Sequence, residues 1–183
     1  MISVRLASIA LVVMLPLVFV TAARTQSGTA SGTMTVNGKT LPIKHAMAVT
    51  YDTPNLGRVV SVLLSDKPAD PKTFQEYTRI GPGERYVPGL ITGAWMTMHV
   101  DDKAFSGFHF TIDEKGRVML GEVLIGPGDN NFSVMDEALA FEQKVKGPRL
   151  AGRIHTKEPV ADLGSEKLGL DLTFDAPVVA VGK

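Results

Sequence analysis

The four histidines are the side chains of this 183-residue chain best suited to acid–base or metal chemistry. His99 and His109 fall on one predicted hairpin whose turn centres on Asp102. That pairing places the two imidazoles about 13 Å apart, too far to share a metal ion. We interpret His45 as a hydrogen-bonded core or rim residue and His155 as a solvated residue near a strand end. We therefore predict no metal site and no cofactor.

Motifs for nucleophilic or phosphate chemistry are absent from the sequence. It contains no Gly-x-Ser-x-Gly elbow, no phosphate loop and no dinucleotide fingerprint. Ser65-Asp66 is typical of a strand end that leads into a helix cap, and Gly-Pro-Gly at 81–83 and 126–128 is typical of turns. No catalytic residue is assigned from these patterns.

One face of the predicted hairpin over residues 90–112 carries aromatic and imidazole side chains. They form a candidate ligand platform that consists of Trp95, His99, Phe105 and His109. The alternative is that a short helix carrying Phe74 and Tyr77 covers this face and completes the core. We favour the cover, because a lone tryptophan is usually well buried.

The elements that would position these side chains begin with three strands over residues 33–66. Asn37-Gly38 between alternating apolar residues is a strong hairpin signal. The outgoing strand is expected to present one face made of Leu41, Ile43, His45, Met47, Val49 and Tyr51. The run 59–64 is apolar on both faces and indicates a central strand.

The rest of the chain continues the pattern. Asp70-Pro71 begins a short helix that ends at 81–83, and strands are expected over 90–100, 104–112 and 118–125. The alternation of Leu139, Phe141 and Val145 favours a strand over 138–145, with a helix as the alternative. The last strand alternates strictly through Leu168, Leu170, Leu172 and Phe174, and ends at Ala176-Pro177. The predicted fold class is all-β, an antiparallel barrel or sandwich of about nine strands with one short helix.

The N-terminus is typical of export. A charged start, an apolar run of about 15 residues and the small residues Thr21-Ala22-Ala23 predict a signal peptide over 1–23. The rival interpretation is an uncleaved anchor, but a spanning helix needs about 20 apolar residues and Pro16 interrupts this run. A flexible leader over 24–31, one β domain over 32–177 and a C-terminal tail over 178–183 follow.

Charge and cysteine content restrict the partners. The chain has 19 basic and 19 acidic side chains, and loss of Arg5 with the signal peptide leaves 18 against 19, a net charge of −1. With no basic cluster, neither nucleic acid nor anionic lipid is an expected partner. The chain has no cysteine, so disulfides, thiol catalysis and a lipoprotein anchor are excluded. We expect a soluble secreted or periplasmic protein that meets the membrane only transiently through its signal peptide.

Several motifs resemble those of uncharacterised secreted bacterial β-rich proteins. These are Gly-Thr-Met-Thr-Val-Asn-Gly-Lys at 32–39, His-Ala-Met-Ala at 45–48, Leu-Ser-Asp-Lys-Pro at 64–68 and Phe-Asp-Ala-Pro at 174–177. The resemblance implies one compact β domain and no catalytic residue.

The expected function is a cofactor-free binding or interaction module with an unidentified ligand or protein partner. A cofactor-independent hydrolase, with a site assembled from scattered His, Asp and Glu residues, is the first alternative. A structural envelope component is the second.

Overall fold

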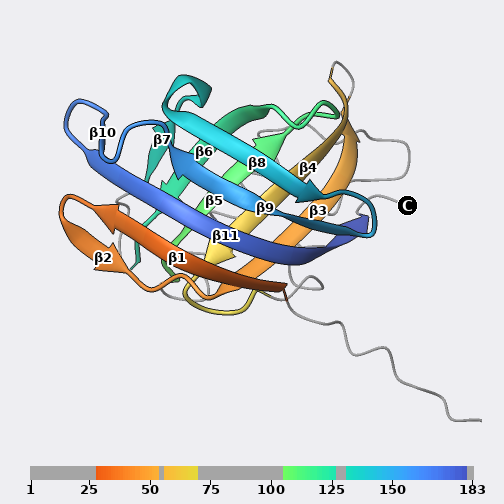
Figure 1. Cartoon of the computed structure of the whole chain (residues 1–183), viewed down its shortest axis with the longest axis horizontal. Helices are drawn as coiled ribbons and strands as arrows, with labels where there is room; N and C mark the ends of the chain where they lie inside the picture. The colour runs from red at the N-terminus through yellow and green to blue at the C-terminus, as the bar shows by residue number, and fades with distance from the viewer. Residues whose placement is uncertain (1–27, 54–55, 70–104, 127–130, 181–183) are drawn as a thin grey trace, which may run out of the picture.

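The computed structural model describes residues 28–53, 56–69, 105–126 and 131–180, which form one sheet curled into a half-barrel (Figure 1). The all-β, antiparallel prediction is confirmed. The predicted helix after Asp70 and the predicted strand over 90–100 lie outside the described residues. The strands are β1 Gly28–Val36, β2 Lys39–Leu41, β3 His45–Thr53, β4 Gly57–Ser65, β5 Gly107–Ile112, β6 Val118–Leu124, β7 Phe132–Val134, β8 Leu139–Val145, β9 Arg149–Thr156, β10 Ala161–Asp162 and β11 Lys167–Ala180, with a 3-10 turn, η1, at Asp136–Ala138.

Nine of the eleven strands follow one path in the order β7-β6-β5-β4-β3-β1-β11-β9-β8. β2 pairs with β1, and β10 pairs with β11. Neighbouring strands are antiparallel, except that Val178–Ala180 of β11 also runs parallel to Ala48–Thr50 of β3. In Figure 1, β8, β9 and β11 cross over β3 to β6, so the inner faces of the two parts of the sheet oppose each other.

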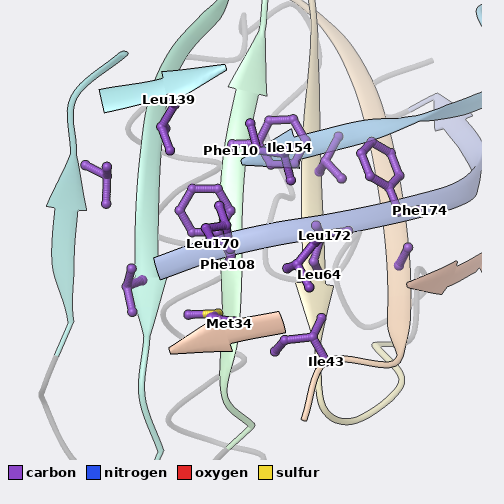
Figure 2. Close-up of a cluster of buried hydrophobic side chains, with 14 of the residues drawn as sticks. Met34, Ile43, Leu64, Phe108, Phe110, Leu139, Ile154, Leu170, Leu172 and Phe174 are labelled. Atoms are coloured by element: carbon purple, nitrogen blue, oxygen red, sulfur yellow. The ribbon is translucent and has the colours of Figure 1, made fainter. Parts of the chain in front are cut away.

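The main core fills the space between these inner faces. Figure 2 shows side chains from both parts of the sheet, including Leu64 and Leu172, that point toward each other. Phe110 packs against both Phe141 and Phe174, with ring centroids 5.7 and 5.8 Å away. Gly121 makes room for Phe108 in the same core, because a Cβ there would lie 2.7 Å from Cζ of Phe108.

A second hydrophobic cluster lies on the outer face of β3 to β6. It consists of Met47, Val49, Tyr51, Val59, Leu63, Phe105 and Leu124. β4 contributes to both cores, as its two apolar faces predict. The central sheet is therefore buried on both sides where β4 runs through it.

The expected single face from Leu41 to Tyr51 is wrong. Residues 42–44 do not belong to a strand, and they separate β2 from β3. Leu41 and Ile43 join the main core, whereas Met47, Val49 and Tyr51 join the outer cluster. Pro42 lacks the N–H that a continuous strand would need, which accounts for a break at this point.

The first and last long strands extend beyond residues 32–177. β1 begins at Gly28, inside the expected leader, because Gly28 and Thr29 pair with β3 and Thr29 also pairs with Asp175. β11 continues past Pro177 to Ala180, inside the expected tail. A strand can continue past a proline when the residues that follow keep their pairing partners. Here β3 supplies partners for the next three residues.

The predicted alternation of buried and exposed residues holds along β11 but ends early in β8. Residues 139–145 form β8, which confirms the strand over the helix alternative. However, Val145 is 48% exposed, because the pairing with β9 shifts between Gln143 and Val145 and ends the alternation. In β11 the alternation is regular: Leu168, Leu170, Leu172 and Phe174 are buried, and Asp171 and Thr173 are exposed.

Candidate functional site

A cavity of about 420 Å³ opens at one end of the half-barrel interior. Its floor is apolar because it consists of the last inward-facing residues of four strands: Val60 of β4, Ile112 of β5, Leu150 of β9 and Val178 of β11. We call this cavity the mouth. Its remaining lining residues are mainly polar: Thr50, Arg58, Asp113, Glu114, Gln143, Lys146 and Gly147.

The rings of Phe110, Phe141 and Phe174 fill the interior behind this floor. Phe110 lies two residues before Ile112 on the same face of β5, and Phe141 stands in the same relation to Gln143 on β8. The rings of Phe141 and Phe174 stack with centroids 6.0 Å apart. The mouth is therefore a pocket in the end of a packed core.

Charges on the rim of the mouth are balanced and already paired. Nε of Arg58 donates to Asp52 at 3.2 Å, and its backbone N–H donates to the Glu114 carboxylate at 3.1 Å. Nζ of Lys146 donates to the Glu114 carbonyl at 2.9 Å. The Asp113 carboxylate accepts from Nε of Arg117 at 2.7 Å. The two positive and two negative lining residues thus give the rim no net charge.

A second hollow, of about 450 Å³, lies on the outer face of β1, β9 and β11. Its lining includes Thr33, Thr35, Arg153, His155 and Asp171. Nε of Arg153 donates to Asp171 at 2.7 Å, and this bond is the main reason that the pKa of Asp171 is lowered. This hollow is open and polar, and it lacks the apolar floor of the mouth.

Only two members of the candidate ligand platform, Phe105 and His109, are among the described residues. Phe105 and His109 are both buried on the outer face of the central sheet. Trp95 and His99 lie outside the described residues, so neither the platform nor its cover is tested there.

The other two histidines are not next to His109. His45 is half-buried at the start of β3. On β9, Nδ1 of His155 donates to the Thr156 carbonyl at 2.9 Å, and its Nε2 lies 3.3 Å from the Glu142 carboxylate. His155 is thus a bonded surface residue in the outer hollow.

His109 belongs to a buried polar network that crosses three strands. Its Nε2 lies 2.6 Å from Oγ of Ser61 on β4, and its Nδ1 lies 3.4 Å from a carboxylate oxygen of Glu122 on β6. His109 and Glu122 are directly paired across β5 and β6, and Ser61 lies diagonally opposite His109. A carboxylate at Nδ1 favours the tautomer with the proton on Nδ1, so that Nε2 accepts from the serine.

Sequence reasoning missed this network, although a signal for it exists. Ser61 is the one polar residue in the apolar run 59–64, and Glu122 is the one charged residue within 118–125. An isolated polar residue in a strand that is apolar on both faces needs a buried partner. The pairing register that identifies His109 as that partner is not encoded locally.

Two hydroxyl groups extend the polar network. Thr111 is the direct cross-strand partner of Ser61, and its side chain hydrogen-bonds to Tyr51. Burial raises the pKa of Tyr51 to about 12, and the bond to Thr111 opposes this rise only in part. Tyr51 therefore remains a neutral donor at neutral pH.

Among the described residues, no three His, Cys, Asp or Glu side chains are grouped to hold a metal ion. In that same part of the chain, no helix is long and apolar enough to cross a membrane. No family model, curated protein or solved structure matches the chain.

Proposed function

We propose that the protein is a binding domain that takes up a small, neutral, largely apolar molecule in the mouth of its half-barrel. The observation that carries this proposal is the apolar floor of a cavity at the end of a filled core, where Val60 and Val178 are only partly buried. The mouth of a β-barrel is a common place for small-molecule sites, and the volume lies within their usual range of about 300–1,000 Å³.

The rim supports a neutral ligand over an ionic one. Its charged side chains are paired with charged residues beside the mouth or with the backbone, so an ionic ligand would have to break these bonds or stay unpaired. An apolar molecule loses nothing at the rim and gains contact with Val60, Ile112 and Leu150 at the floor. Polar groups at one end of such a ligand would meet Thr50 and Gln143.

Export remains part of this proposal. The signal peptide expected over residues 1–23 would deliver the domain to the periplasm or the exterior, where a cysteine-free fold needs no redox partner.

The test is a fluorescence titration with N-phenyl-1-naphthylamine, a neutral apolar probe that brightens in apolar surroundings. Val60→Trp fills the mouth from its floor and should weaken probe binding at least tenfold. Val160→Trp is the matched control, because Val160 is 54% exposed and does not line the mouth. This control should bind the probe like the native chain.

Circular dichroism melts show whether Val60→Trp lowers the stability of the domain. If it does, Val178→Phe, which fills the mouth from β11, replaces it in the titration. Equal probe affinity in the native chain and both filled variants would overturn the proposal. So would a native chain that leaves the probe fluorescence unchanged.

A further inference from the structure

We propose that Asn37 is a site of spontaneous deamidation, and that its bonds to the turn between β10 and β11 control both the rate and the consequence of the reaction. The folded chain holds the Asn37 amide and slows its conversion, and the acidic product loses one of these bonds. Asn37 lies in the β1–β2 turn and does not line the mouth. The proposal is therefore independent of the proposed binding function.

Asparagine followed by glycine is the dipeptide in which deamidation is fastest, because glycine has no side chain to hinder the attack. The backbone nitrogen of Gly38 attacks Cγ of Asn37, and the proton of that nitrogen leaves with the side-chain amide as ammonia. Water then opens the five-membered succinimide at either carbonyl, which gives aspartate or isoaspartate. Of the four asparagines in the chain, Asn37 is the only one followed by glycine. The reaction needs only these two residues and water.

The β1–β2 turn leaves this dipeptide open to solvent. The φ angles of Asn37 and Gly38 are 51° and 79°, as the two central positions of a type I′ turn require. Both residues are exposed, and a Cβ built on Gly38 would meet no described atom within 4 Å. Water can therefore reach the site, and crowding by the described residues does not prevent the attack.

The turn between β10 and β11 holds the Asn37 amide at both of its ends. Oδ1 of Asn37 accepts from the N–H of Lys167 at 2.8 Å, and its Nδ2 donates to the Glu166 carboxylate. The backbone N–H of Asn37 also donates to the Lys167 carbonyl, at 2.9 Å. Attack draws Cγ to within bonding distance of the Gly38 nitrogen, which displaces the amide from both of its partners. The folded state should therefore slow the reaction.

Deamidation replaces the attraction between Asn37 and Glu166 with repulsion. The product at position 37 is a carboxylate at neutral pH, so it cannot donate to Glu166 as Nδ2 does. Two like charges then face each other between the two turns. These turns lie at the end of the β1–β11 ladder, whose last pair is Val36 with Leu168. The product should therefore loosen the sheet at that end.

The first test compares how fast Asn37 converts in the folded protein and in the same protein unfolded in guanidinium chloride. Peptide mass mapping follows the change from amide to acid, and the other three asparagines serve as internal references. Conversion in the folded protein should be about tenfold slower or more, the effect expected of one or two hydrogen bonds. Equal rates in the two states would overturn the proposal.

Glu166→Ala identifies the bond that holds the amide. This variant should convert several-fold faster than the native chain when folded, and at the same rate when unfolded. Glu137→Ala is the matched control, because it removes an exposed carboxylate from η1 and leaves the bonds of Asn37 in place. It should convert like the native chain. A folded Glu166→Ala chain that converts no faster than this control would contradict the assigned role of Glu166.

The second test concerns the product. Asn37→Asp should lower the urea midpoint by about 0.5 M, because it loses a donor and gains a repulsion. Asn37→Asp combined with Glu166→Gln exchanges the carboxylate and the amide, so that the glutamine can donate to the aspartate. The midpoint of this double variant should return toward the native value. No loss in Asn37→Asp, or no recovery in the double variant, would show that deamidation does not break this contact.

Discussion

The polar network on the outer face of the central sheet consists of five side chains: Tyr51, Ser61, His109, Thr111 and Glu122. Burial of a polar group costs free energy unless a hydrogen bond replaces its water. The hydrogen bonds from Ser61 through His109 to Glu122, and from Tyr51 to Thr111, meet this need. Their pairing makes each residue sensitive to the charge state of its partner.

Tyr51 gives a prediction at alkaline pH. Burial raises its pKa to about 12, whereas a tyrosine in the unfolded chain ionises near pH 10. The stability that Tyr51 contributes is therefore complete below pH 10, and it is lost as the pH rises through 12. Tyr51→Phe should remove this part of the pH dependence.

The measurement is the urea midpoint at pH 9 and at pH 11 for both chains. The fall between the two pH values should be larger in the native chain than in Tyr51→Phe. Tyr51→Phe also loses the hydrogen bond to Thr111, but this loss is the same at both pH values and does not affect the difference between the two midpoints. An equal fall would contradict the assigned burial of the hydroxyl.

At the scale of single elements, the alternation of side chains along β11 determines which of them are buried. Leu172 is fully buried in the main core, and the next residue, Thr173, is exposed opposite Arg153. Leu172→Asp should lower the free energy of unfolding by about 4 kcal/mol or more, because it buries an unpaired carboxylate and leaves a cavity. Thr173→Asp should cost less than about 1 kcal/mol. Denaturant melts of the two variants check this, and similar losses would show that the alternation is misassigned.

Local patterns were sufficient for most strands and for the hairpin at Asn37-Gly38, where Asn37 has the positive φ of 51° that the turn requires. They missed the break at Pro42, a local signal, which moves Met47 and Val49 to the other face. They also failed where a strand depends on distant partners: β11 passes Pro177 because β3 is beside it. Those partners are far apart in sequence, so no local window contains the information.

The candidate sites were harder to predict for the same reason. The mouth combines residues from Thr50 to Val178, which no motif links, and only the curl of the sheet brings them together. Of the polar network, the sequence singled out His109 but neither Ser61 nor Glu122. The choice between barrel and sandwich was open for the sequence, and the structure resolves it as a half-barrel. Export and the resemblance to secreted proteins remain predictions.

At the scale of the whole molecule, the end of β11 joins two parts of the sheet. Val178–Ala180 pairs with β3, and the N–H of Val178 donates to the Pro148 carbonyl at 2.9 Å. A chain that stops at Pro177 should be less stable by roughly 2–3 kcal/mol than one that stops at Ala180, through lost pairing and valine burial. It should also bind the apolar probe more weakly, because Val178 lines the mouth.

Thermal and denaturant melts of the two truncated chains measure this difference directly. The chain that ends at Ala180 is the reference, so only the three strand residues differ. Equal midpoints would show that the parallel segment contributes nothing to the fold.

β11 also determines when the fold can form during synthesis. It pairs with β1, β3, β9 and β10, and in the main path it is the strand between β1 and β9. Until it is made, no strand pairing among the described residues joins the β8–β9 hairpin to the strands from β7 to β1. A growing chain that has not yet reached β11 therefore cannot form the native sheet, and its apolar faces stay open to a chaperone until that strand is made.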